Sequence, residues 1–132
     1  MNGTRVTVEH LFEQLGAGAS PAEVAEHFHE DVDWFIAGDT SVVPWIGRKT
    51  GRAGVAEFYQ QLRDLTRPVE FVIERTVVEG PNAVVLGHLV TEIPATGKRI
   101  ESEFAFDIQV HDGLISRYHM FEDTWAVTNA LR

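Results

Sequence analysis

The chain has 132 residues, 44% of them hydrophobic, and its 11 basic and 20 acidic residues give a net charge of −9. This length fits one domain, residues 1–132, with a core of ordinary size. The negative charge disfavours nucleic-acid binding, and the absence of cysteine excludes disulfides and thiol chemistry.

Two helices are predicted at the start of the chain. Apolar residues at positions 8, 11, 12 and 15 form the stripe of an amphipathic helix, which the glycines at 16 and 18 end. Ser20, Pro21 and Glu23 then supply an N-cap, a proline at the first helical position and the glutamate of a capping box. The second helix is therefore expected to run from this cap to about Phe28.

The next segment is predicted to hold a short strand, a long loop and a third helix. Residues 32–36 fit a strand, and the glycines and the proline of 38–51 indicate a loop. Loops of this length in compact domains are often functional. Val55, Phe58, Tyr59 and Leu62 return to helical spacing, and Pro68 limits this helix.

From residue 69 onward the pattern changes to strands. Segments 69–79, 83–93, 98–110 and 114–123 are rich in Val, Ile, Phe and Thr and are separated by turn residues, which predicts a four-strand antiparallel meander. Residues 124–131 suggest a short C-terminal helix. Helices first and strands afterwards favour an α+β fold in which a curved sheet packs on three N-terminal helices.

Four segments carry a resemblance to a known family: GAGAS at 16–20, HFHEDVDWF at 27–35, WIGRKTGRAGVAEFY at 45–59 and VHDGLISRYHMFEDTWAV at 110–127. Together with the element order they resemble the nuclear transport factor 2-like superfamily. Within it they are similar to the SnoaL-like group, which includes polyketide cyclases, ketosteroid isomerase and limonene epoxide hydrolase. The resemblance spans the whole chain and implies a cone-shaped α+β barrel around a small-molecule cavity.

The registration to limonene epoxide hydrolase runs without gaps from Gly97 to Asp123 and places Asp123 on that enzyme's C-terminal catalytic aspartate. The other catalytic positions differ: the second aspartate falls at His88, and the arginine between the two falls near Leu86. The tyrosine and asparagine of the first strand fall at Trp34 and Ile36. The catalytic triad of ketosteroid isomerase is absent.

Asp123 and His88 are the predicted catalytic residues. If Asp123 points into the cone, strand alternation places His119 and Phe121 on its face, and the registration adds His88. A carboxylate and an imidazole facing one apolar cavity could be poised near neutrality for proton transfer. The hypothesis assigns Asp123 as the base and His88 as the group that orients it or polarises the substrate.

An aromatic wall is predicted to hold the substrate. Its members are the aromatic residues expected on inner positions or in the loop, together with one histidine: Trp34, Trp45, Phe58, Phe104, Phe106, His119 and Phe121. No metal site is expected, because His27 and His29 diverge on a helix and no three-ligand spacing occurs.

Each of these assignments has a structural alternative. Asp123 is also a suitable N-cap for the C-terminal helix, and both roles could coexist. His88 and His119 could be hydrogen-bonded core histidines. Glu122, of opposite parity to Asp123, is expected to face water or a subunit neighbour.

The sequence thus predicts a small-molecule enzyme that needs no cofactor and uses acid-base catalysis for isomerisation, cyclisation, dehydration or epoxide hydrolysis of an apolar substrate. The alternative is a non-catalytic member that binds a ligand or a protein. A homodimer is expected, because the outer sheet face would carry Tyr118, Met120, Ile108 and Val110. No apolar run suits a membrane span and the N-terminus lacks a signal-peptide pattern, so we expect a cytoplasmic protein.

Overall fold

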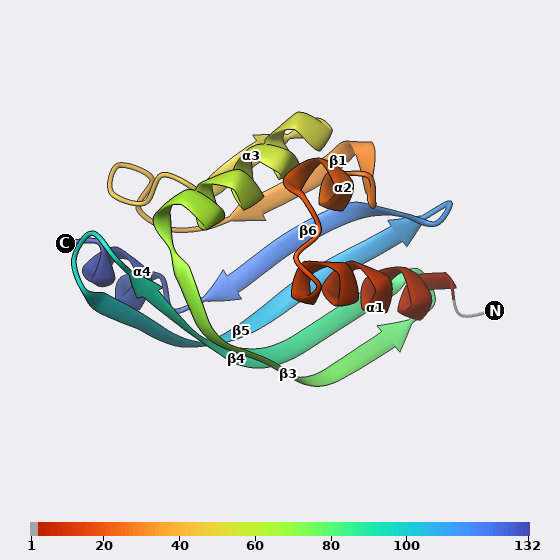
Figure 1. The fold of residues 1–132 in the computed structure, drawn as a ribbon. Coiled ribbons are helices and arrows are strands. Elements are labelled where there is room, and N and C mark those ends of the chain that lie inside the picture. The colour runs from red at the N-terminus through yellow and green to blue at the C-terminus, as the bar shows by residue number, and fades with distance from the viewer. Residues whose placement is uncertain (1–2) are drawn as a thin grey trace.

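The computed structural model describes residues 3–132, which form four helices and six strands (Figure 1). In chain order these are α1 (Gly3–Gly16), α2 (Pro21–Ala25), β1 (Phe28–Ile36), β2 (Gly47–Thr50), α3 (Gly51–Leu65), β3 (Arg67–Glu79), β4 (Asn82–Ile93), β5 (Lys98–His111), β6 (Leu114–Glu122) and α4 (Thr124–Ala130). None of the helices in this part of the chain is both long and apolar enough to span a membrane.

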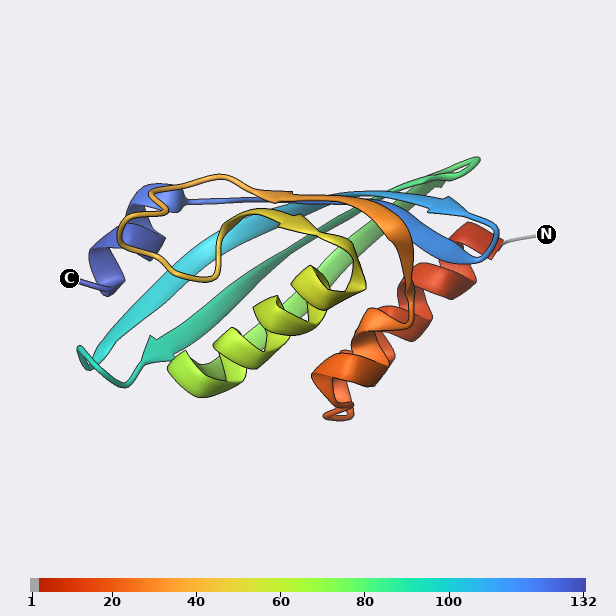
Figure 2. The same cartoon turned by 90° about the horizontal axis from the view of Figure 1, so that it is seen from above.

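The six strands form one curved sheet in the order β2-β1-β6-β5-β4-β3. Strands β3 to β6 make the predicted antiparallel meander, and β1 lies parallel to β6. Figure 2 shows the helices α1, α2 and α3 on one face of this sheet, while α4 follows the end of β6. The structure confirms the predicted α+β class, with a sheet that is mixed because of the β1–β6 pairing.

The core lies between the sheet and the three N-terminal helices. Its largest fully buried side chains include Trp34 and Phe28 from β1, Leu11 from α1 and Ile108 from β5. The stripe predicted for α3 is confirmed, since Val55, Phe58 and Tyr59 are all buried. Burial of this apolar surface is the main force that holds the helices against the sheet.

The element boundaries differ from the predictions mainly in the first third of the chain. The capping box at Ser20 is confirmed, but α2 ends at Ala25 and β1 already begins at Phe28. The predicted loop at 38–51 contains the short strand β2, which pairs with the end of β1. The first part of β1 was not predicted because residues 29–31 are a histidine and two acidic residues. Their side chains face solvent, so this part of the strand lacks an apolar pattern.

A β-bulge in β6 decides which side chains of this strand face the helices. A two-residue turn at Asp112 and Gly113, both with positive φ, pairs His111 with Leu114. If this pairing continued along the strand, the odd-numbered side chains of β6 would face the helices. Instead the pairing shifts by one residue at Ser116. A shift of one residue moves every later side chain to the opposite face. Beyond the bulge, the even positions face the helices.

Candidate functional site

Glu122 is the carboxylate that β6 presents to the inner face of the sheet. It follows Tyr118 and Met120 on the same face, and its register partner on β5 is the buried Phe104. The expected inward orientation of His119 and Phe121 is wrong, because the bulge turns the odd positions outward. Glu122, which was expected to face water or a neighbouring subunit, lines the inner cavity and also borders an open hollow of the sheet.

An apolar cavity lies between the inner face of the sheet, α3 and α4. Its volume is about 80 Å³, and its lining comes from all three layers: Ile36, Trp45, Phe58, Leu62, Thr66, Leu89, Thr91, Ile100, Met120, Glu122 and Val127. Glu122 is the only ionisable side chain in this lining. The remainder is aliphatic, aromatic or a threonine hydroxyl, which is the usual character of a small-molecule site.

The cavity changes the acidity of Glu122. Burial in apolar surroundings is the larger cause and the charge of the adjacent Asp123 the smaller one, and together they raise the pKa of its carboxyl from 4.5 to about 7. Both effects disfavour the ionised form, one by removing water and the other by repulsion. A carboxyl with this pKa is present in both protonation states near neutral pH, so it can take up or release a proton there.

Asp123 lies at the junction of β6 and α4, where its side chain caps the helix. The carboxylate accepts a hydrogen bond of 3.0 Å from the backbone N–H of Ala126, and the Asp123 N–H donates to the Ser102 hydroxyl at 2.9 Å. The predicted N-cap role is therefore confirmed, and α4 begins at Thr124 as expected. A catalytic role for Asp123 stays a prediction.

His88 lies on the outer face of β4, so its expected inward orientation is wrong. Ala83, Val85 and Leu89 take the inner positions of this strand. The His88 ring is bonded to the Glu70 carboxylate at 2.9 Å and lies 3.7 Å from that of Glu74. The hydrogen bonds of Asp123 and His88 thus go to different partners, and the structure does not bring these two side chains together as a pair.

The predicted aromatic wall divides into three sets. Trp45 and Phe58 line the cavity. Trp34, Phe104 and Phe106 are buried on the inner face, next to the cavity lining. His119 and Phe121 lie on the outer face, where the Phe121 side chain is 57% exposed. Whether any of them contacts a substrate stays a prediction.

His119 belongs to a network of charges on the outer face of β1 and β6. Its Nε2 atom lies 2.9 Å from the Asp33 carboxylate, which also accepts hydrogen bonds from Arg48 at 3.0 Å and Arg117 at 3.2 Å. Arg117 continues to Asp107 at 3.0 Å. These bonds, that of His119 first among them, lower the pKa of Asp33. The network is a structural alternative to the wall role predicted for His119.

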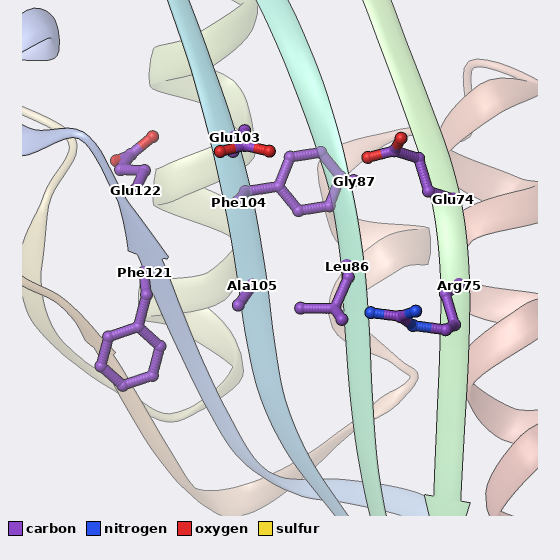
Figure 3. A pocket seen from close by; sticks show the side chains of 9 residues that line it. All are labelled: Glu74, Arg75, Leu86, Gly87, Glu103, Phe104, Ala105, Phe121 and Glu122. Carbon is purple, nitrogen blue, oxygen red and sulfur yellow. The ribbon is translucent and has the colours of Figure 1, made fainter.

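A second and larger hollow of about 570 Å³ lies over β3 to β6 (Figure 3). Figure 3 shows Glu74, Glu103 and Glu122 at one end, and Arg75, Leu86, Ala105 and Phe121 toward the other. This hollow is broad and open to solvent, and Glu122 lies between it and the inner cavity, since it lines both. The smaller inner cavity is the better candidate for chemistry, because an apolar and enclosed site strengthens electrostatic effects.

No group of three or more His, Asp or Glu side chains within residues 3–132 is arranged to hold a metal ion.

Sequence reasoning missed Glu122 because Asp123 was assumed to point inward. Strand alternation then placed Glu122 on the outer face. A usable signal was present: Tyr118 and Met120 are largely apolar, whereas Arg117 and His119 are polar. That contrast favours the even positions for the buried face. It conflicts with the register set by the hairpin turn, and a conflict of this kind indicates a bulge.

Comparison with known proteins agrees with the fold. The model of the SnoaL-like domain matches residues 8–118, and no curated protein matches the chain in sequence. An NTF2-like protein from Burkholderia xenovorans is 22% identical, with a TM-score of 0.87 and coverage of 98% of this chain and 96% of that one.

Two further similar structures contain small molecules. TerC, co-crystallised with polyporic acid, is 18% identical, with a TM-score of 0.81 and coverage of 98% of both chains. A protein with a ketosteroid isomerase-like fold from Catenulispora acidiphila, in complex with trimethylamine, is 12% identical with a TM-score of 0.66, covering 79% of this chain and 75% of that one. These identities support the fold alone. The family model spans most of the chain, and the chain therefore belongs to the SnoaL-like family.

Proposed function

We propose that this protein is a cofactor-independent enzyme that moves a proton on an apolar small molecule, with Glu122 as the acid-base residue. The observation that carries the proposal is the position of Glu122 as the only ionisable side chain in an apolar cavity. Small molecules in the similar structures of TerC and the Catenulispora protein support a ligand site in this fold.

The proposed step is removal of a proton from a carbon next to a carbonyl group. The Glu122 carboxylate takes the proton, the electron pair moves into the carbonyl to form an enol or enolate, and the resulting carboxylic acid returns the proton to the same or another carbon. A pKa of about 7 suits both directions of this transfer at neutral pH. The step fits those isomerisations, cyclisations and dehydrations that begin with removal of a proton next to a carbonyl group.

Asp123 has a supporting role in this proposal. Its charge helps to keep the pKa of Glu122 near neutrality, and its cap fixes the start of α4, which supplies Val127 to the cavity. The original hypothesis, in which Asp123 is itself the base, competes directly with this one. Asparagine at position 123 distinguishes them, because it preserves an N-cap acceptor while removing the charge.

Exchange of carbon-bound hydrogen tests the proposal without knowledge of the natural substrate. The ketone 2-tetralone in D₂O serves as the probe, and loss of its proton signals next to the carbonyl is followed by NMR. The wild-type protein is expected to accelerate exchange over buffer. Glu122→Gln should lower the rate by at least about a hundredfold, the usual scale for loss of a general base.

Asp123→Asn is the matched variant, and it should retain exchange within about tenfold of the wild type. Loss of exchange in Asp123→Asn with retention in Glu122→Gln would reverse the assignment in favour of Asp123. Binding of 2-tetralone without any exchange in the wild type would instead support the alternative function, a non-catalytic ligand-binding protein.

We also propose that the protein is a homodimer through the outer face of β3 to β6. The residues expected there from the sequence are inside: Tyr118, Ile108 and Val110 are buried, and Met120 lines the cavity. Other apolar side chains are exposed on the outer face, namely Val77, Val84 and Phe121. Such a patch on a single chain commonly marks an interface.

The charges around the larger hollow, which lies over β3 to β6, suit pairing with a second copy of the chain. Arg75 lies toward one end, and Glu74 and Glu103 lie at the other (Figure 3). A two-fold axis through this face would bring each arginine toward the partner's carboxylates, as an isologous interface requires.

Light scattering at micromolar concentration tests the dimer. The wild type should have twice the mass of one chain, and Phe121→Glu should have the mass of one chain. Val6→Ser is the matched control, because Val6 is equally exposed but lies on α1, on the helical side of the sheet. A wild-type monomer contradicts the interface.

A further inference from the structure

Three hydrogen-bond donors lie deep in the core beside the cavity. They belong to Trp34 on β1, Tyr59 on α3 and Tyr118 on β6, whose residues are 0%, 8% and 2% exposed. The Trp34 Nε1 atom has no hydrogen-bond partner within residues 3–132. The hydroxyl oxygens of the two tyrosines lie 3.3 Å apart and are bonded to each other.

Not every donor in this group has a hydrogen-bond acceptor. Either tyrosine hydroxyl can donate to the other, but the one that accepts then has no acceptor for its own proton among the described residues. Together with the Trp34 N–H, two donors in the core are unused. Buried donors without partners are rare in native proteins and call for an explanation.

The donor group lies at the inner end of the cavity wall. Trp34 is paired with Tyr118 in the sheet and stacks on it with ring centroids 4.5 Å apart. The next inner pair, Ile36 and Met120, already lines the cavity. Phe58 also lines the cavity, and its ring centroid is 4.9 Å from that of Trp34. One layer of side chains therefore separates the donors from the cavity.

The surroundings decide what kind of acceptor fits. The aromatic rings of Phe28, Phe58 and Phe106 pack around the donor group, and the two tyrosine hydroxyls are hydrogen-bonded to each other. Burial raises the pKa of both tyrosines, so the hydroxyls stay neutral and protonated. An anionic ligand group would lose its hydration here without gaining a cation, whereas a neutral oxygen would gain donors.

We propose that Trp34, Tyr59 and Tyr118 bind a neutral oxygen of the substrate, a hydroxyl or carbonyl remote from the carbon on which Glu122 acts. The inference rests on the proposed function and adds the substrate class: an elongated apolar molecule with an oxygen at each end. Tyr118 and Glu122 are four residues apart on β6, roughly 13 Å along the strand, which sets the length of the molecule.

Binding in this manner requires Phe58 and Met120 to move aside. The cavity of about 80 Å³ is smaller than the roughly 150 Å³ that holds benzene in an engineered apolar core. Met120 is only partly buried, and an unbranched methionine adapts readily to a new shape. The cavity then extends along β6 from Glu122 to the donor group.

Two probes of equal size test the inference. In 6-hydroxy-2-tetralone a hydroxyl lies at the far end from the ketone, and in 6-methyl-2-tetralone a methyl group of similar size replaces it. The wild type should bind the hydroxyl probe about three- to tenfold more tightly, the usual worth of one net hydrogen bond. In the NMR spectrum, the Trp34 indole N–H signal should shift with the hydroxyl probe and not with the methyl probe.

Removal of single donors locates the effect. Trp34→Phe and Tyr118→Phe should each reduce the preference for the hydroxyl probe and leave the affinity for the methyl probe within about twofold. Trp125→Phe, at a tryptophan that is 74% exposed, is the control and should keep the preference. Equal affinities in the wild type, or an unmoved Trp34 signal, overturn the inference even if a core variant fails to fold.

Failure of the inference is distinguishable from failure of the proposed function. Glu122→Gln should lose hydrogen exchange yet keep the preference for the hydroxyl probe. Exchange that depends on Glu122, combined with equal affinities for the two probes, would leave the proposed function standing and remove only the donor site.

Discussion

Two carboxylates on neighbouring strands of the same sheet have opposite electrostatic environments. Glu122 faces the inner cavity, where burial raises its pKa to about 7. Asp33 faces outward, where His119, Arg48 and Arg117 hold its pKa below the usual value. The strands β1 and β6 are hydrogen-bonded to each other, so the contrast comes from the face and not from the region of the sheet.

The difference separates a candidate reactive group from a structural one. A carboxylate surrounded by cations is stabilised in its charged form and has little tendency to accept a proton at neutral pH. A carboxylate in an apolar cavity is destabilised in its charged form and accepts a proton readily. The outer group is therefore expected to increase stability at neutral pH, and the inner group to decrease it.

The largest expected effect is a gain of stability at high pH when the inner carboxylate is removed. Because the folded pKa of Glu122 is raised, its contribution to stability is complete below about pH 4.5 and is lost as the pH rises through about 7. At about 1.4 kcal/mol per pKa unit the loss is roughly 3 kcal/mol. Glu122→Gln should therefore be more stable than the wild type by up to this amount at pH 8.

Urea unfolding measures this difference at pH 8 and at pH 4.5, where the two proteins should be nearly equal. Taking the difference between variant and wild type at each pH removes the contribution of all other titrating groups. A variant that is less stable than the wild type at pH 8 would contradict the burial of an ionised Glu122.

A smaller effect of opposite sign is expected on the outer face. The lowered pKa of Asp33 means that its contribution is present above the unfolded pKa near 3.8 and is lost as the pH falls through the folded value. The Asp33 side chain is 42% exposed, so solvent screens its ion pairs. Asp33→Asn should cost about 1 kcal/mol at pH 7 and less at pH 3, as followed by thermal unfolding.

Asp31→Asn is the control for this comparison. Asp31 is exposed on the same strand and has no ion pair within residues 3–132, so its replacement should leave stability unchanged at both pH values. An equal loss in the two variants would attribute the effect to overall charge and not to the network.

The smallest expected effect on stability belongs to Asp123→Asn. Asparagine caps helices about as well as aspartate, so the free energy of unfolding should change by less than about 0.5 kcal/mol. The removal of its charge should nevertheless lower the pKa of Glu122, because repulsion from Asp123 contributes to the raised value. NMR titration of the Glu122 carboxyl carbon measures this shift, and an unchanged pKa would exclude coupling between the two groups.

Much of the architecture could be predicted from local patterns. The capping box at Ser20 and the stripe at Val55, Phe58 and Tyr59 gave two helices correctly, because caps and apolar periodicity act within a few residues. The meander strands agreed with their predicted limits to within two residues at each end, since turn residues interrupt the apolar runs. The resemblance to the SnoaL-like family supplied the arrangement of these elements, which local patterns do not contain.

The site was less predictable, because orientation depends on register. Both faces of β4 carry apolar residues, so alternation alone did not show that His88 faces outward. In β6 a single extra residue at Ser116 exchanged the faces on which Asp123 and Glu122 were expected. Such an insertion is set by the fit between strands, which lie far apart in the sequence.

The parallel pairing of β1 with β6 also has a consequence for how the molecule is made. Asp33 and Arg117 meet across this pairing although they are 84 positions apart, and β2 is joined to the sheet only through β1. As the chain leaves the ribosome, β1 and β2 must wait until β6 has been synthesised. The first third of the chain is thus exposed to misfolding and chaperones until translation of β6 is complete, and folding of a chain with such distant contacts is expected to be slow.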